Sequence, residues 1–133
     1  MKSSLLKKCL EIARDNNTPI KHPQWGCYHH FSFIIQEGKI IDWGTNRKAS
    51  PLTFLGYLPH AKIHSETDAY FKAKGIMIKG ASFEIVNIRL NKMSKIMNSE
   101  PCKCCFTFLN NMGCKKAWFT TKIGNFACII FRT

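Results

Sequence analysis

Residues 28–44 decide the fold, and they read YHHFSFIIQEGKIIDWG. The first part of this stretch is rich in aromatic and β-branched side chains, which favour extended strands. Glu37-Gly38 supplies a turn, and residues 39–44 form a second stretch of strand length. We therefore predict an antiparallel hairpin made of strands 28–36 and 39–44.

Helices and further strands alternate on both sides of this hairpin. Apolar residues at helical spacing predict a helix over residues 3–16. Downstream, the pattern predicts a helix over 65–74, a strand over 82–90, a short helix that begins at Pro101 and ends at Gly113, and strands over 116–121 and 126–132. Ser65 is the expected N-cap of the 65–74 helix, with Asp68 at the capping-box position. Residues 45–63 are interrupted by Asn, Pro and Gly and are expected to form a long loop.

The last two strands are separated only by residues 122–125, which include a Gly-Asn pair. A gap of this length does not accommodate a crossover helix, so these strands are predicted to form an antiparallel hairpin. The whole order of elements, α-β-β-α-β-α-β-β, is typical of an α/β fold. The chain has 133 residues, and we predict a single domain over residues 1–133.

The composition is that of a globular protein with a strong positive charge. Twenty Lys and Arg stand against eight Asp and Glu, which gives a formal net charge of +12. Such a surface attracts polyanions or phosphorylated small molecules. A general compositional bias toward lysine, without any anionic partner, would produce the same net charge. The sequence contains neither a membrane-spanning apolar run nor a signal-peptide core, so the expectation is a soluble, cytoplasmic protein with no membrane contact.

The cysteines point to metal binding or buried thiols rather than to disulfides. Seven is an odd number, and the chain shows no export signal. Four of them lie in apolar patterns and are expected in the core as small hydrophobic residues, namely Cys9, Cys27, Cys114 and Cys128. The other three fall within the short segment 102–105.

Two predicted helix starts carry most of the chemistry. The first reads His64-Ser65-Glu66 and the second reads Pro101-Cys102-Lys103-Cys104-Cys105, so together they contain H-x-E and P-C-x-x-C. One imidazole and two thiolates provide three ligands for tetrahedral zinc and leave the fourth position open for water, which is the catalytic pattern. A helix start also favours thiolate over thiol. The Glu66 carboxylate beside such a water can take its proton and pass it to a substrate.

Two simpler interpretations of the same residues remain open at this stage. A buried cysteine pair and a core histidine can share this spacing without binding a metal. Alternatively, Cys104 or Cys114 can act as a fourth ligand and close a purely structural zinc site. The closed site leaves Glu66 without a role.

The H-x-E and P-C-x-x-C segments resemble the signature of the zinc-dependent cytidine and deoxycytidylate deaminase superfamily. Gly44-Thr45-Asn46 is similar to the G-x-N segment of that family, and Glu100-Pro101-Cys102 is similar to the E-P-C form of tRNA adenosine deaminases. The resemblance implies a three-layer α/β/α fold. Its five-stranded mixed sheet would end in the C-terminal antiparallel hairpin.

The resemblance also implies a role for each matching residue. Zinc is the implied cofactor, and its implied ligands are His64, Cys102 and Cys105. Glu66 would activate the zinc-bound water and carry its proton. The backbone at Ser65 would face the ring carbonyl of the base, and Asn46 would contact the base or the sugar. Family members commonly assemble so that neighbouring subunits complete each other's pockets, which implies a homo-oligomer.

The implied activity is hydrolysis of cytosine to uracil in a nucleoside or nucleotide, a hydrolase reaction of nucleotide metabolism. The C-terminal hairpin resembles free-nucleoside deaminases, whereas His64 and the E-P-C segment resemble the nucleotide and tRNA enzymes. A first alternative is a deaminase of cytosine or adenine in single-stranded DNA, RNA or tRNA, which the net charge of +12 favours. A second alternative is a catalytically inactive zinc-binding module of the same fold.

Overall fold

The computed structural model describes residues 1–18, 28–48 and 62–132. Its centre is the predicted hairpin, in which β1 (Tyr28–Gln36) pairs antiparallel with β2 (Lys39–Thr45). Glu37 and Gly38 both have positive φ, 50° and 73°. Two consecutive positive φ angles produce a tight turn whose twist matches the flanking strands.

The remaining strands complete a mixed sheet. On the side away from β2, β1 pairs antiparallel with β5 (Phe83–Asn91). β5 in turn runs parallel to β7 (Cys114–Thr120), and β7 pairs antiparallel with β8 (Phe126–Ile130). The order across the sheet is β2-β1-β5-β7-β8. The C-terminal antiparallel hairpin is therefore confirmed. The sheet has six strands rather than the predicted five, because the chain turns back after β5 and adds β6 (Ile96–Met97).

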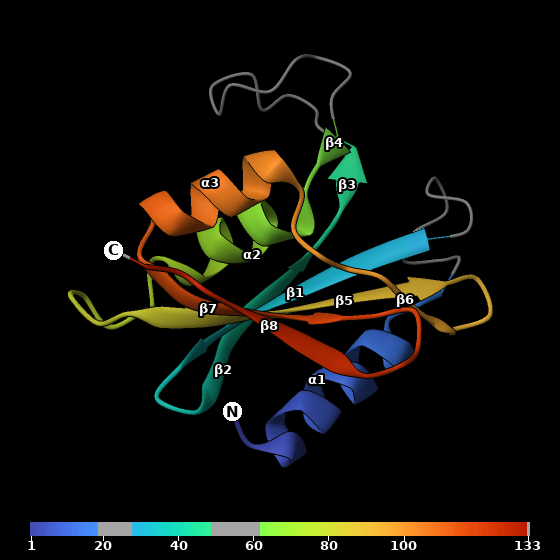
Figure 1. Ribbon diagram of the computed structural model, residues 1–133. Coiled ribbons are helices and arrows are strands. Elements are labelled where there is room, and N and C mark those ends of the chain that lie inside the picture. Colours follow the sequence, from blue (N-terminus) through green and yellow to red (C-terminus); the bar gives the residue numbers. More distant parts are fainter. Residues whose placement is uncertain (19–27, 49–61, 133) are drawn as a thin grey trace.

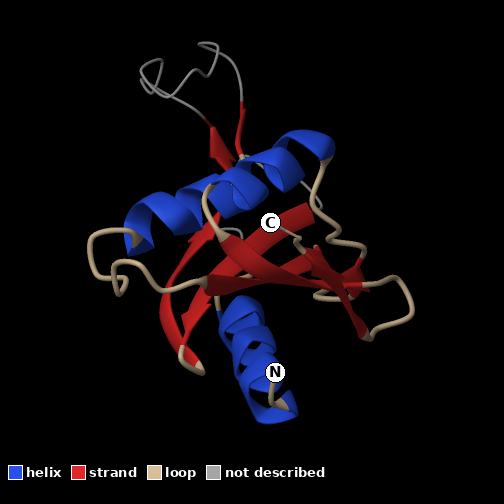
Figure 2. Ribbon diagram, turned by 60° about the vertical axis from the view of Figure 1, so that its left-hand side comes forward, coloured by secondary structure: helices blue, strands red, loops and turns tan. Residues whose placement is uncertain are grey.

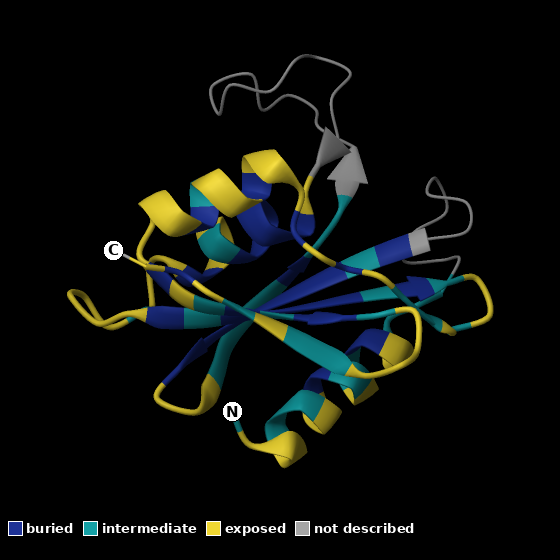
Figure 3. Ribbon diagram, in the orientation of Figure 1, coloured by how far each residue is buried: buried dark blue, intermediate teal, exposed yellow. Residues whose placement is uncertain are grey.

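Helices cover both faces of this sheet and form the predicted three layers (Figure 1, Figure 2). α1 (Ser3–Asp15) lies on one face, and α2 (Ser65–Ala73) and α3 (Lys103–Asn111) lie together on the other. Buried residues run along the sheet and the inner faces of the helices (Figure 3). Among the described residues, no helix is long and apolar enough to cross a membrane.

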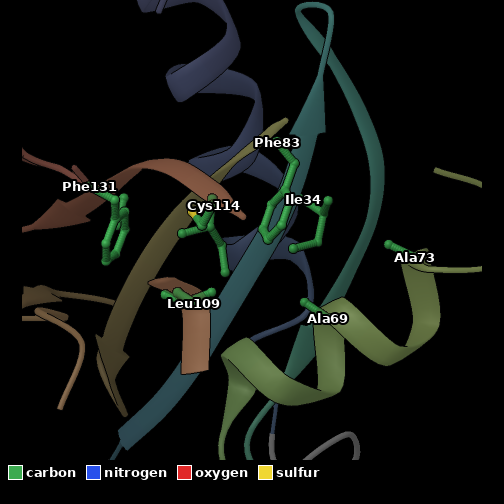
Figure 4. Packing of buried hydrophobic residues seen from close by; sticks show 9 residues of the cluster. Ile34, Ala69, Ala73, Phe83, Leu109, Cys114 and Phe131 are labelled. Carbon is green, nitrogen blue, oxygen red and sulfur yellow. The ribbon is translucent and has the colours of Figure 1, made fainter. Parts of the chain in front are cut away.

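Alternating side chains of β1 and β5 separate two cores. Phe31, Phe33 and Ile35 pack with residues of α1, whereas Ile34 packs with α2 residues such as Ala69 and with Leu109 of α3 (Figure 4). This period of two places Ser32, like Ile34, on the sheet face beneath α2. Burial of these apolar residues supplies most of the driving force that holds the helices on the sheet.

The predicted helix starts need correction. The N-cap of α2 is His64, with extended backbone angles, and Ser65 is already the first helical residue. Asp68 does not serve the predicted capping box with Ser65, because its Oδ2 accepts a hydrogen bond of 3.0 Å from the backbone N–H of Thr45 on β2. α3 begins at Lys103 rather than at Pro101. Tertiary contact with β2, rather than the local capping pattern, decides where the Asp68 side chain points.

The predicted long loop contains two short strands at its ends. β3 (Arg47–Lys48) and β4 (Lys62–Ile63) form a two-stranded ladder within the predicted loop, and the segment between them lies outside the described residues. Cys9 and Cys114 are buried as predicted, whereas Cys128 is exposed because it lies on the edge strand β8. Cys27 lies outside the described residues.

Candidate active site

The N-terminal ends of α2 and α3 meet and bring the three predicted metal ligands together. His64 is the N-cap of α2, Cys102 is the N-cap of α3, and Cys105 lies in the first turn of α3. Their ligand atoms all lie within 4.8 Å of one another. The Nδ1 atom of His64 is 3.1 Å from Cys105 Sγ and 3.6 Å from Cys102 Sγ. Residues 38 and 41 positions apart in the sequence thus become neighbours.

This geometry fits a zinc ion. At ordinary Zn–N and Zn–S bond lengths, two ligand atoms of a tetrahedral centre stand about 3.5–3.8 Å apart. The distance of 3.6 Å lies in this range and that of 3.1 Å lies slightly below it. One imidazole and two sulfur atoms form a typical zinc donor set. His64 and Cys102 are exposed while Cys105 is buried, so the site faces solvent on one side.

Neither cysteine proposed to close the site joins this group. Within the part of the chain that the structure describes, the clustered ligand atoms come from His64, Cys102 and Cys105. Cys104 is exposed on α3, and Cys114 lies in the core between the sheet and α3. Among the described residues, the arrangement therefore matches the pattern of three clustered donors with an open position rather than that of a four-ligand site.

Protonation of Cys105 differs from the sequence-based expectation. Burial, and then the nearby Glu66 carboxylate, raise the pKa of the Cys105 thiol well above its ordinary value. In the metal-free chain, desolvation thus outweighs the effect of the helix start that favoured a thiolate. A metal ion that binds here must displace the proton of Cys105.

Glu66 lies beside the ligand group, where α2 packs on the sheet. Its side chain is buried. Its Oε2 accepts a hydrogen bond of 3.2 Å from Asn87 Nδ2, and its Oε1 lies 3.2 Å from Ser65 Oγ. A cavity of about 120 Å³ contains this carboxylate, and its lining includes His64 and Cys102. A larger cleft of about 620 Å³ lies between α1 and the β1–β2 turn and contains none of the motif residues.

Of the two predicted substrate contacts, Ser65 lines this cavity and Asn46 is bonded to a residue that lines it. Ser65 lines it directly and is almost completely buried. Asn46 follows β2 and is held against β1, because its Oδ1 accepts a hydrogen bond of 2.9 Å from the N–H of His30 and its own N–H donates to the carbonyl of His30. His30 is also a lining residue of the cavity. Asn46 is thus one residue removed from the lining of this cavity.

Sequence reasoning missed a buried polar group beneath Glu66. Ser32 on β1, Asn87 on β5, Ser99 before α3 and Thr120 on β7 are all buried and hydrogen-bonded to one another. A usable signal was present, because Ser32 and Asn87 are polar residues with apolar neighbours on both sides in the sequence. Buried polar residues at such positions need partners, and their partners become visible only once the strands are paired.

Solved structures show what this arrangement of elements is similar to. The cytidine deaminase of Burkholderia pseudomallei superposes with a TM-score of 0.58 at 15% identity, covering 98% of this chain and 93% of that chain. The dCMP deaminase of the cyanophage S-TIM5 superposes with a TM-score of 0.57 at 16% identity, covering 91% and 86%. This chain has the cytidine deaminase fold.

The fold that the motif resemblance implied is thus confirmed. The cytidine deaminase of Mycobacterium leprae is a further neighbour, with a TM-score of 0.53 at 13% identity over 94% of this chain and 90% of that chain. No protein-family model matches the sequence, and no curated protein matches it. The similarity to the cytidine deaminase fold therefore lies in the architecture, at low sequence identity.

Proposed function

We propose that this protein is a zinc-dependent hydrolytic deaminase that converts cytosine to uracil in a nucleoside or nucleotide. The observation that supports this most directly is the position of Glu66, which lines one small cavity together with His64 and Cys102, two of the three clustered ligand residues. The fold is shared with both cytidine and dCMP deaminases. A structure of the cyanophage dCMP deaminase contains dCMP and dUMP, which supports a nucleotide as substrate.

Each site residue has a defined part in this chemistry. His64, Cys102 and Cys105 would hold zinc, which as a Lewis acid makes water a stronger nucleophile. Glu66 takes a proton from the attacking water and delivers it to the ring nitrogen of the base. A bond forms between the water oxygen and the amine-bearing carbon, the carbon–nitrogen bond breaks, and the amine leaves as ammonia with a further proton carried by Glu66. The backbone at Ser65 faces the ring carbonyl of the base, and Asn46 contacts the base or the sugar.

The test is a mass-spectrometric deamination assay of the zinc-loaded protein. Cytidine, deoxycytidine, their monophosphates and single-stranded DNA and RNA oligonucleotides are compared under the same conditions, and bound zinc is measured by elemental analysis. Turnover of the small substrates is expected. An absence of turnover on every substrate in the zinc-loaded protein would contradict the proposal and favour the inactive module.

Glu66→Gln is the matched variant for this assay. The amide keeps the shape of the side chain but does not take up a proton, so kcat is expected to fall by about 10²–10⁴-fold. Bound zinc is expected to stay at the wild-type level, because Glu66 is not among the clustered ligands. Full activity of Glu66→Gln would remove Glu66 from the mechanism.

The net charge of +12 favours a second candidate, a deaminase of cytosine or adenine in single-stranded nucleic acid. Binding to a phosphate chain through lysines releases counterions and weakens steeply as salt rises. If an oligonucleotide is the substrate, its apparent affinity should fall by at least tenfold when the salt concentration rises from 50 to 200 mM. The fall becomes steeper with each additional phosphate that the protein contacts. Turnover of cytidine or dCMP with no turnover of oligonucleotides would exclude this candidate.

A further inference from the structure

Ser32 and Asn87 form a polar cross-strand pair directly beneath Glu66. They are register partners on β1 and β5, and they are 0% and 2% exposed. Their neighbours on the same sheet face, Ile34 and Ile85, belong to the apolar core under α2. A polar pair at this position costs stability unless each group finds a hydrogen-bond partner, so its contacts identify what it does.

The hydrogen bonds of Asn87 determine the orientation of its side-chain amide. A carboxylate only accepts hydrogen bonds, so the contact of 3.2 Å with Glu66 Oε2 requires Asn87 to present Nδ2. Its Oδ1 then faces Ser32 Oγ at 2.7 Å and accepts a hydrogen bond from the Ser32 hydroxyl. Because a serine hydroxyl has one proton, Ser32 in turn accepts from Ser65 Oγ, which lies 2.7 Å away. The result is a chain of donors that runs from Ser65 through Ser32 and Asn87 to Glu66.

A second set of contacts holds Asn87 from the side of α3. The Nδ2 atom also lies 3.5 Å from the carbonyl of Ser99, and the hydroxyl of Ser99 donates to the backbone carbonyl of Asn87 at 2.8 Å. Both protons of the amide and its oxygen therefore have partners. Ser65 Oγ also lies 3.2 Å from Glu66 Oε1, a longer contact than its 2.7 Å approach to Ser32, which leaves Oε1 as the less firmly held oxygen.

We propose that Asn87 is a positioning residue for Glu66. Oriented by Ser32 and Ser99, it holds Oε2 of the carboxylate and aims Oε1 into the cavity, where proton transfer takes place. The kinetic consequence rests on the proposed deaminase function, whereas the orientation of Glu66 does not. A donor that fixes a catalytic group contributes to the transition state more than to substrate binding, so its removal lowers kcat and leaves KM largely unchanged.

The test compares Asn87→Leu with Thr120→Val in the zinc-loaded protein. Leucine has the same number and branching of side-chain heavy atoms as asparagine and suits an apolar strand, but it provides no donor for Glu66. Thr120→Val also removes a buried hydroxyl of the polar group, one that contacts Ser99 and the carbonyl of Met97 without touching Glu66. For Asn87→Leu we expect kcat to fall by about 10–100-fold, with KM within about twofold and one zinc per chain retained. For Thr120→Val we expect wild-type kcat and a lower melting temperature.

A crystal structure of zinc-loaded Asn87→Leu provides a readout that does not depend on turnover. The Glu66 carboxylate is expected to rotate away from its wild-type position or to occupy several conformers. Wild-type kinetics in Asn87→Leu, an equal loss of kcat in Thr120→Val, loss of zinc together with kcat, or an unmoved Glu66 would each overturn the proposal. If the wild-type protein deaminates no substrate, the proposed function fails, and the crystal structure alone then decides the role of Asn87.

Discussion

Two neighbouring cysteines at the start of α3 face different surroundings. Cys105 is buried and directs its sulfur to His64 at 3.1 Å, whereas Cys104 is exposed. We expect Cys105→Ala to lose bound zinc, because two remaining ligands do not hold a tetrahedral ion firmly. Cys104→Ala is the matched control, with the same change one residue away, and should keep one zinc per chain. Elemental analysis after gel filtration measures both, and zinc loss in Cys104→Ala would show that Cys104 is a ligand.

At the scale of elements, the contact between β2 and α2 determines where the site residues lie. Gly44 lies so close to α2 that a Cβ atom there would stand 2.4 Å from the backbone nitrogen of Ala69. The hydrogen bond from the Thr45 N–H to the Asp68 carboxylate joins the same two elements. α2 begins directly after His64 and contains Glu66, so any displacement of this helix also displaces a candidate metal ligand and the proposed proton carrier.

We therefore expect Gly44→Ala to push α2 off the sheet. The overpacking should lower the free energy of unfolding by about 1–3 kcal/mol and weaken zinc binding at the same time. Gly75→Ala, just after α2, is the control, because a Cβ there meets no atom within 4 Å. Chemical denaturation and competitive zinc titration measure the two effects. A Gly44→Ala protein with the stability and zinc affinity of Gly75→Ala would contradict the importance of this close approach.

At the scale of the whole molecule, each of the two cores contains a buried thiol. Burial raises the pKa of Cys9 and of Cys114 to about 12. In the unfolded chain these thiols ionise near their ordinary pKa of 9.0. The folded protein binds these protons more tightly than the unfolded chain does. The contribution of the two thiols to the free energy of unfolding is therefore fully present below pH 9 and is lost as the pH rises from 9 toward 12.

The expected loss is roughly 1 kcal/mol per thiol at pH 10. Cys9→Ala removes one of these groups, so its stability should decline less steeply between pH 8 and pH 10 than that of the wild type, although it starts lower because of the cavity. Urea denaturation at each pH measures the difference. Parallel declines in the two proteins would show that the thiol of Cys9 ionises in the folded state as readily as in the unfolded one.

The local sequence determined most of the elements. Periodicity of two and of 3.6 residues depends on neighbours along the chain, which explains why β1, α1 and the C-terminal hairpin match their predictions closely. The candidate metal ligands and Glu66 were also recognisable, because both motifs are short and each ligand lies at or near a helix start. The resemblance that these motifs carried agrees with the fold that the structure shows.

Only the tertiary structure decided how distant residues meet. It brings His64 beside Cys105, pairs Ser32 with Asn87 beneath Glu66, and directs Asp68 to β2 rather than to its own helix start. It also sets the protonation of Cys105 through burial. These outcomes depend on strand register and on which side chains lose contact with water, and neither quantity is contained in the spacing of residues along the chain.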